Sequence, residues 1–303
     1  MLIDSPALAM MARSRVVTAD GDVEGAAGFV TWRGGSRTMR FITANGIKLA
    51  YERSGAGDPV LLIMGSGASG RVWTAHQTPA LNKAGYETII FDNRGVAPSD
   101  APPGRYSLDD MVADTIGLIE ALGIGPCHVV ATSLGAVIAE EIAIDRPELV
   151  RSAVLMATRS RSDLVRRALH RADQVLSESG VRLPTAYSAP TSVLQMFSPR
   201  TLNDDAAVSL WLDVFELSGD ATAGGQDWVD VGSDRRERLR RVPVPCRMIA
   251  FSDDLICPPH LAAEVAETIP DCDLVEIDGA GHLGNLERPD EVNTAVIEFL
   301  GKF

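Results

Sequence analysis

A serine stands at the junction of a strand-like segment and a helix-like segment. Val129–Ala131 has the apolar character of a strand buried on both faces, and Gly135–Ile144 is typical of a helix. Ser133 lies between them, with the small residues Ala131 and Gly135 two positions away on either side. A turn this sharp needs small neighbours and holds the hydroxyl at the carboxyl edge of a sheet, beside a helix N-terminus. The segment predicts a nucleophilic serine, although the usual pattern has glycine in place of Ala131; the alternative is a serine that only caps a helix.

A histidine in a glycine-flanked loop follows the last predicted strand. Leu274–Ile277 predicts that strand, and His282 follows it after Gly279 and Gly281. The other four histidines of the chain lie in no such turn. A general base must reach the serine hydroxyl with one ring nitrogen and present the other nitrogen to an acid. His282 is the candidate base, and the alternative is a loop histidine without a chemical role.

Two aspartates follow the strand predicted for Arg247–Phe251. A carboxylate at this position can orient an imidazole ring and stabilise its protonated form. Asp254 is the preferred candidate and Asp253 is its rival. The alternative is that both aspartates only form a turn before the helix that begins near Pro259.

The three candidates occur in the chain order Ser133, Asp254, His282, each at the end of a predicted strand. In this arrangement the histidine takes the proton of the serine hydroxyl, and the serine attacks a carbonyl to form an acyl-enzyme that water then hydrolyses. The predicted chemistry is acyl cleavage or transfer, and it needs no metal ion and no organic cofactor.

Strands and helices alternate from Phe41 onward. The other predicted strands are Phe41–Thr43, Ile47–Glu52, Val60–Met64, Thr88–Phe91 and Ala153–Met156, and the other predicted helices are Trp73–Lys83, a helix capped by Ser107 and ended by Gly123, Leu261–Thr268 and Asp290–Phe299. Asn45-Gly46 separates the first two strands as a hairpin turn. Strands separated by helices predict an α/β fold with a mostly parallel central sheet flanked by helices.

The alternation is interrupted between residues 160 and 241. Helical segments follow one another there without a strand: Ser162–Ser179, Ala189–Phe197, Asp204–Leu217 and Gln226–Val231. Residues 39–159 and 242–303 are therefore predicted to form the core, and residues 160–241 an all-helical cap inserted into it.

Residues 1–38 show no sustained periodicity and are rich in glycine, which predicts a flexible extension. Met39 directly precedes the first strand and is an alternative start of the natural protein.

Charge and cysteine content narrow the possible partners. A formal net charge of -13 should repel phosphate backbones and anionic membrane surfaces, so we expect neither a nucleic-acid nor a membrane partner. No apolar run approaches the ~20 residues of a membrane span, and the N-terminus is a poor secretory signal. The four cysteines show no metal-binding or disulfide spacing, which favours reduced thiols and the cytoplasm.

Residues 40–303 resemble the α/β-hydrolase superfamily, in the branch of esterases, lactonases, thioesterases, cofactor-free haloperoxidases and carbon–carbon bond hydrolases. Beyond the three candidates, Leu61–Gly67 looks like the family's strand and oxyanion turn, and Phe91–Ser99 looks like its D-x-R-G-x-x-x-S loop. The resemblance implies that the backbone N–H groups of Ser66 and Leu134 form an oxyanion hole. The family often has histidine where this chain has Met64; we expect that difference to change packing more than chemistry.

The cap and the oxyanion turn are expected to set the substrate. Candidate substrate-binding residues are Gly65, Gly67, Trp73, Phe197 and Trp211, with Met156, Met196 and Phe215 as further apolar candidates. The alternative is that the apolar ones form the core of the cap. Arginines cluster at both cap junctions and either attract an anionic substrate or pair with nearby carboxylates on solvated helix faces, which we favour. They are Arg159, Arg161, Arg166, Arg167, Arg171, Arg235, Arg236, Arg238, Arg240 and Arg241.

The sequence thus predicts a serine hydrolase of a small or medium ester, lactone or thioester, with a small acyl molecule as its partner. Two alternatives stay open. One keeps the fold and the three residues but performs perhydrolysis, cyclisation or carbon–carbon cleavage. The other is a binding module without catalysis, against which the presence of all three residues argues. Fold alone does not decide among them.

Overall fold

The computed structural model describes residues 39–218 and 224–303. The extension predicted for residues 1–38, and with it the question of a start at Met39, lies outside the described residues.

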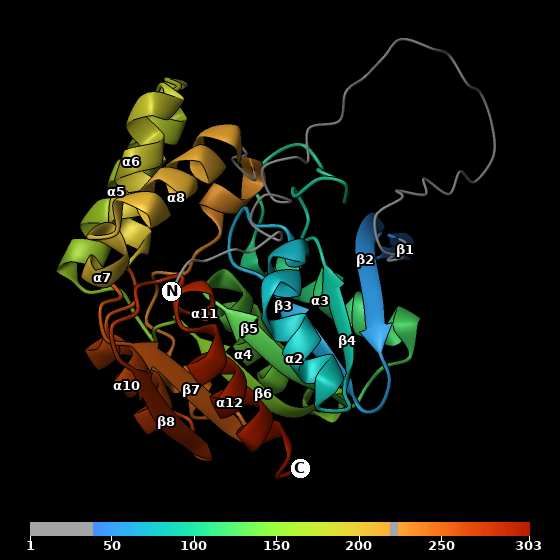
Figure 1. Ribbon diagram of the computed structural model, residues 1–303. Helices are drawn as coiled ribbons and strands as arrows, with labels where there is room; N and C mark the ends of the chain where they lie inside the picture. The colour runs from blue at the N-terminus through green and yellow to red at the C-terminus, as the bar shows by residue number, and fades with distance from the viewer. Residues whose placement is uncertain (1–38, 219–223) are drawn as a thin grey trace.

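Eight strands form one sheet in the order β1-β2-β4-β3-β5-β6-β7-β8. Their bounds are β1 (Arg40–Ala44), β2 (Ile47–Gly55), β3 (Pro59–Ile63), β4 (Glu87–Phe91), β5 (Cys127–Thr132), β6 (Val150–Met156), β7 (Cys246–Phe251) and β8 (Cys272–Ile277). β2 runs antiparallel to β1 and to β4, whereas every other pair is parallel. The prediction of an α/β fold with a mostly parallel sheet is confirmed (Figure 1).

The sheet is buried on both faces by helices. Along β3, Leu61 and Ile63 pack into one apolar cluster with helices on one face of the sheet, whereas Val60 and Leu62 pack into a second cluster with helices on the other face. Alternate side chains of a strand point to opposite faces, so a strand covered on both sides reads as a continuous apolar run. The core elements are η1 (Gly70–Ala75), α2 (Gln77–Lys83), α3 (Leu108–Leu122), α4 (Leu134–Asp145), η2 (Pro147–Leu149), α10 (Pro259–Thr268), α11 (Gly284–Glu287) and α12 (Pro289–Leu300).

The helix predicted for Trp73–Lys83 is two elements, η1 and α2, separated at His76. Pro79 accounts for the break, because its ring conflicts with the carbonyl four residues earlier in a continuous helix and it has no N–H to donate. The helix predicted between Ser107 and Gly123 is α3. The hydroxyl of Ser107 accepts from the backbone N–H of Asp110, and Gly123 ends the helix at φ 61°.

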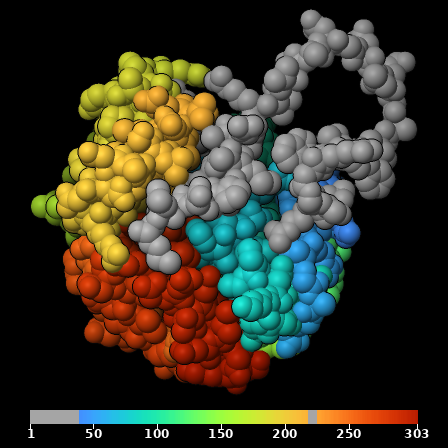
Figure 2. Space-filling view, viewed as in Figure 1, coloured from blue at the N-terminus to red at the C-terminus, as the bar shows by residue number. Residues whose placement is uncertain are grey.

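Residues 160–241 lie between β6 and β7 and contain no strand in their described part; we call them the helical insertion. Its elements are α5 (Leu164–Ser179), α6 (Thr185–Met196), α7 (Pro199–Leu202), α8 (Asp205–Ser218), η3 (Gly224–Trp228) and α9 (Arg236–Leu239). Figure 1 shows α5, α6 and α8 lying together beyond one end of the sheet. In the space-filling view the insertion, in yellow, lies against the red C-terminal part of the chain (Figure 2).

Six of the ten arginines at the two ends of the insertion form ion pairs with carboxylates, whereas Arg159 and Arg167 donate to backbone carbonyls. The ion pairs are Arg161–Glu264, Arg166–Asp163, Arg235–Glu140, Arg236–Asp234, Arg238–Glu141 and Arg240–Glu237. These contacts favour the alternative of paired arginines over a surface for an anionic substrate.

All four cysteines are free thiols. None of the helices in the described ranges is long and apolar enough to cross a membrane.

Candidate active site

Ser133 occupies the turn between β5 and α4 in a strained backbone conformation. Its φ is 54° and its ψ is -123°, a combination that L-residues rarely adopt. The turn is fixed because the backbone N–H of Ser133 donates to the carbonyl of Met156 at the end of β6, at 2.9 Å. The serine itself is half-buried, so its hydroxyl is accessible at the carboxyl edge of the sheet.

The residues around Ser133 are small because other backbone lies close. A Cβ at Gly135 would lie 2.3 Å from the carbonyl oxygen of Ile63, and one at Gly65 would lie 3.1 Å from the Cβ of Ser133. Ala131 is fully buried between β3 and β6. α4 therefore packs directly on the end of β3, which brings the Gly65–Gly67 turn beside the serine.

His282 links the serine to an aspartate. Its Nε2 lies 3.1 Å from the Oγ of Ser133, and its Nδ1 lies 2.9 Å from the Oδ2 of Asp254. The ring is only 5% exposed, and the aspartate is 2% exposed. Three residues predicted from separate segments, at the ends of β5, β7 and β8, therefore form one hydrogen-bonded chain.

Asp254, rather than Asp253, has its carboxylate against His282. The Oδ1 of Asp254 also accepts the backbone N–H groups of Ile256 and Cys257, at 2.8 Å each. Burial alone would raise the pKa of Asp254, but the charge and hydrogen bond of His282 and the two backbone donors together lower it. The carboxylate is thus ionised and can hold Nδ1 in its protonated tautomer.

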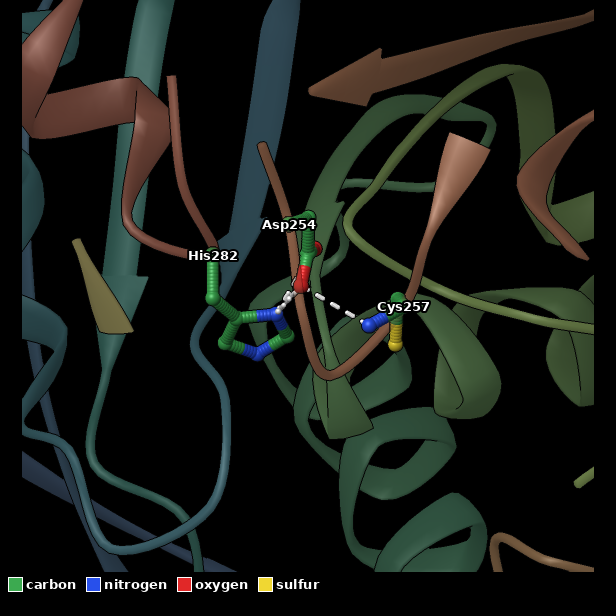
Figure 3. Close-up of side chains that lie close together, drawn as sticks. All are labelled: Asp254, Cys257 and His282. Atoms are coloured by element: carbon green, nitrogen blue, oxygen red, sulfur yellow. Dashed lines mark hydrogen bonds and ion pairs between the residues drawn. The ribbon is translucent and has the colours of Figure 1, made fainter. Parts of the chain in front are cut away.

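The buried group Asp254, Cys257 and His282 is the one set of potential metal ligands among the described residues (Figure 3). Its members already have other partners. Burial raises the pKa of the Cys257 thiol to about 12, and the guanidinium of Arg159 lies 3.2 Å from its sulfur. A protonated thiol beside a cation is a poor ligand, and a metal ion would compete with the bond between Asp254 and His282.

The predicted oxyanion donors flank Ser133. Leu134 is the first residue of α4, where backbone N–H groups have no acceptor within the helix. Ser66 is an exposed residue of the turn that follows β3. The turn is fixed at its start because the side-chain amide of Asn93 donates to the carbonyl of Met64 at 3.2 Å.

The apolar candidates for substrate binding lie in two clusters. Trp73 is fully buried with Met156 against the sheet, and its Nε1 has no hydrogen-bond partner in the part of the chain that the structure describes. The rings of Phe197 and Trp211 pack against each other in the core of the insertion, with their centroids 4.6 Å apart and their planes tilted by 37°. That cluster includes Leu283, the residue after His282.

The insertion contacts the loop that carries His282. The backbone N–H of Leu283 donates to the carbonyl of Met196 at 3.1 Å. The carboxylate of Glu287 accepts the N–H of Gly281, the N–H and hydroxyl of Ser198, and the hydroxyl of Thr201. Glu287, Asn93 and Gln226, which contacts the oxyanion turn, were not predicted from sequence. Only Asn93 had a signal, since it lies within the D-x-R-G loop.

Comparison with known proteins gives a match to one family model and to several named relatives. The model of the alpha/beta hydrolase family matches residues 60–295. A relative from Mycobacterium tuberculosis strain H37Rv, named "Putative non-heme bromoperoxidase BpoC", is 45% identical over 256 residues, which is 84% of this chain and 97% of the relative. Its crystal structure superposes with a TM-score of 0.76 at 43% identity, covering 84% of this chain and 96% of that one.

Two further matches carry other names. A protein of Azorhizobium caulinodans named "Putative carbamate hydrolase RutD" is 31% identical over 258 residues, 84% of this chain and 95% of the relative. A thermophilic esterase from Thermogutta terrifontis superposes with a TM-score of 0.74 at 26% identity, covering 87% of this chain and 98% of that one. The similar proteins share the fold and differ in the reactions their names state.

Proposed function

The chain belongs to the alpha/beta hydrolase family, and from that premise we propose that it is a serine hydrolase that cleaves a small or medium ester, lactone or thioester. The observation that carries the proposal is the hydrogen-bonded chain from Ser133 through His282 to Asp254. An imidazole within 3.1 Å of an accessible serine hydroxyl, with its other nitrogen on an ionised carboxylate, is the arrangement that activates a serine for attack.

The mechanism assigns one role to each group. His282 takes the proton of Ser133 as the hydroxyl oxygen attacks the substrate carbonyl, and Asp254 stabilises the resulting imidazolium. The backbone N–H groups of Ser66 and Leu134 stabilise the negative charge on the former carbonyl oxygen. His282 then protonates the leaving group. In the second half, His282 takes a proton from water as the water attacks the acyl-enzyme. It then returns that proton to the Oγ of Ser133 as the acyl–oxygen bond breaks and the acid leaves.

A fluorophosphonate probe and a short-chain p-nitrophenyl ester test this proposal. Wild-type protein should be labelled and should release p-nitrophenol, and Ser133→Ala should do neither while keeping its fold. Ser152→Ala is the matched control, because Ser152 is a buried serine whose hydroxyl contacts His128 instead of His282. A folded wild type that takes no label would overturn the acyl-enzyme mechanism.

A second candidate function is perhydrolysis, and the relative named as a non-heme bromoperoxidase favours it. Hydrogen peroxide would replace water in the second half-reaction, giving a peracid and free Ser133. The two functions are separated by supplying acetate and peroxide and measuring peracetate. A peracetate yield that is lost in Ser133→Ala, beside negligible ester turnover, would favour perhydrolysis.

The relative named as a carbamate hydrolase suggests a further leaving group, because the same attack on a carbonyl cleaves a carbamate. The ester assay should therefore be repeated with a p-nitrophenyl carbamate. A binding module without catalysis is the least supported reading, since binding alone does not require the contact between His282 and Ser133.

A further inference from the structure

One residue of the helical insertion contacts the turn that carries the proposed oxyanion donor Ser66. Gln226 lies in η3, far along the chain from that turn, and is 3% exposed. Its side-chain Oε1 accepts the backbone N–H of Gly67 at 2.9 Å and the hydroxyl of Ser66 at 3.3 Å. Its Nε2 donates to the backbone carbonyl of Arg94 at 2.7 Å.

These partners fix the orientation of the Gln226 amide. The N–H of Gly67 can only donate and the carbonyl of Arg94 can only accept, so a reversed amide would lose both bonds. Because the side chain is buried, losing either partner would leave a polar group without a hydrogen bond, which is destabilising.

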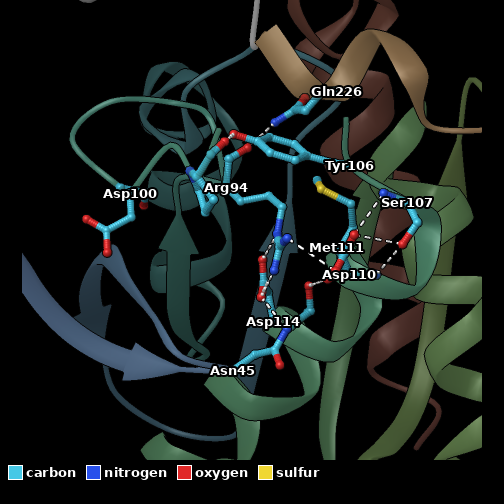
Figure 4. Close-up of polar contacts among 12 residues, drawn as sticks. Asn45, Arg94, Asp100, Tyr106, Ser107, Asp110, Met111, Asp114 and Gln226 are labelled. Carbon is cyan, nitrogen blue, oxygen red and sulfur yellow. Dashed lines mark hydrogen bonds and ion pairs between the residues drawn. The ribbon is translucent and has the colours of Figure 1, made fainter. Parts of the chain in front are cut away.

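The carbonyl that anchors Gln226 belongs to Arg94, whose side chain lies in a network of ion pairs and hydrogen bonds (Figure 4). The buried guanidinium of Arg94 forms two bonds with Asp114, at 2.5 and 2.7 Å, and lies 3.4 Å from Asp110. Asn45 donates to the same Asp114 at 2.9 Å. The loop after β4 is thus fastened to α3, and it offers Gln226 a fixed acceptor.

The backbone of η3 is seated beside the same loop. The carbonyl of Gly225 accepts the N–H of Tyr106 at 3.0 Å. A Cβ at Gly225 would lie 2.5 Å from the ring of Tyr106 and 2.6 Å from the carbonyl oxygen of Gly104, so only glycine permits this approach. The position of Gln226 is therefore set by its neighbour as well as by its own hydrogen bonds.

The oxyanion turn is consequently held at two points. Asn93 holds its start through the carbonyl of Met64, and Gln226 holds its end through the N–H of Gly67. Gly67 has a φ of 67°, in the left-handed region, and the peptide groups on either side take their direction from it. Because both ends of the turn are fixed, the peptide group of Ser66 between them has little freedom to rotate.

We propose that Gln226 is a positioning residue for the oxyanion hole, so that the helical insertion completes the catalytic centre through one side chain. This inference rests on the proposed function. Gln226 acts through Ser66 and Gly67 and takes no part in proton transfer. Loss of its contacts should lower the rate of acyl transfer and leave substrate binding nearly unchanged, because oxyanion donors act mainly on the transition state.

The test compares Gln226→Met with Asp227→Asn. Methionine has a similar length and no hydrogen-bonding amide, whereas Asp227 is the next residue of η3 and its carboxylate accepts the hydroxyl of Ser177 at 3.5 Å. Removal of one oxyanion donor costs about 10²–10³-fold in kcat, so loosening one should cost about 10–100-fold. We expect that loss in kcat and in the rate of labelling by a fluorophosphonate for Gln226→Met, with KM within about threefold of wild type.

Hydrogen exchange of backbone amides supplies a readout that needs no activity. The amide of Gly67 should exchange at least about tenfold faster in Gln226→Met than in Asp227→Asn, because a lost hydrogen bond of ~1.4 kcal/mol is a tenfold change. Gln226→Glu keeps an oxygen for Gly67, so it should retain slow exchange there. Gln226→Leu, which also lacks the amide, replaces the methionine variant if that variant does not fold.

The outcomes separate this inference from the proposed function. A reactive wild type with unchanged kcat, labelling rate and Gly67 exchange in Gln226→Met overturns the inference alone. A raised KM with unchanged kcat also overturns it, because Gln226 would then bind substrate instead of positioning the turn. A folded wild type that is not labelled by the fluorophosphonate overturns the proposed function. The catalytic role of Gln226 is then overturned as well.

Discussion

Two neighbouring aspartates follow β7, and their side chains have different surroundings. Asp254 is buried and contacts both His282 and the backbone N–H groups of the next turn. Asp253 is half-buried, and its backbone N–H donates to the carbonyl of Ala280 in the loop of His282. The sequence alone favoured Asp254 but could not separate the two, because both follow the strand and either could turn toward the histidine.

Exchange of each aspartate for asparagine tests the assignment. In Asp254→Asn the amide can donate to Nδ1, which places the ring proton on Nε2, where it faces Ser133 and blocks the base. We expect kcat for the p-nitrophenyl ester to fall by about 10³–10⁴-fold, with the fold retained. Asp253→Asn is the matched control and should stay within a few-fold of wild type. Equal losses in the two variants would contradict the role of Asp254.

The loop after β4 supports the active site as an element. Asp92 begins it, and its Oδ1 accepts the hydroxyl of Ser69 and the backbone N–H of Gly70, at 2.7 and 2.8 Å. These bonds tie the loop to the start of η1, next to the oxyanion turn. Burial raises the pKa of Asp92 from 3.8 to about 6, against the effect of those two donors and of Arg71.

This pKa makes the stability of the fold depend on pH. The folded protein holds the proton of Asp92 more firmly than the unfolded chain, so stability from this group is lost as the pH rises from 3.8 to about 6. Asp92→Asn removes the buried charge and keeps an acceptor for both donors. We expect it to be more stable than wild type by about 1–3 kcal/mol at pH 7 by urea unfolding, since one pKa unit is 1.36 kcal/mol.

The advantage of Asp92→Asn should shrink as the pH falls from 6 toward 4, because wild type then also carries a neutral group. Asp100→Asn is the control, as an exposed aspartate of the same loop. A difference between Asp92→Asn and wild type that is the same at pH 7 and pH 4 would contradict the argument.

The elements that the sequence predicted are those with a strong local pattern. The strands at the centre of the sheet are buried on both faces and therefore appear as apolar runs, as at Val60–Met64. α3 was predicted at both ends because Ser107 and Gly123 are local signals. Short elements such as α7, α9 and α11 have too few residues to show a period.

Contacts between segments that lie far apart in the chain leave no local pattern in the sequence. Glu287 and Gln226 are polar residues in short helices, and their sequence neighbours do not show which backbone groups they face. Their roles follow from the way the insertion packs on the core, through Ser198 in one case and Arg94 in the other. A single sequence holds the residues of these contacts but not their pairing.

At the scale of the whole molecule, a buried ion network joins the insertion to the core. Arg235, at the start of α9, is 6% exposed and pairs with Glu140 and Glu141 of α4, the helix that begins after Ser133. Its backbone N–H also donates to the carbonyl of Ser160 at the other end of the insertion. The two ends of the insertion and the helix of the proposed nucleophile therefore meet at one arginine.

Arg235→Met tests how strongly this network couples the insertion to the core. Burial raises the pKa of Glu140, and Arg235 opposes that rise, so removing the arginine leaves the buried carboxylate of Glu140 without its cation, whereas Glu141 keeps Arg238. Breaking such a pair costs about 3–5 kcal/mol, which should appear as a lower urea midpoint at pH 7. The loss should be smaller at pH 5, where the raised pKa lets Glu140 bind a proton more readily.

Arg236→Met is the control, because Arg236 pairs with Asp234 at the surface and its loss should move the midpoint little. Equal midpoints for the two variants would mean that this ion network contributes nothing to holding the insertion on the core.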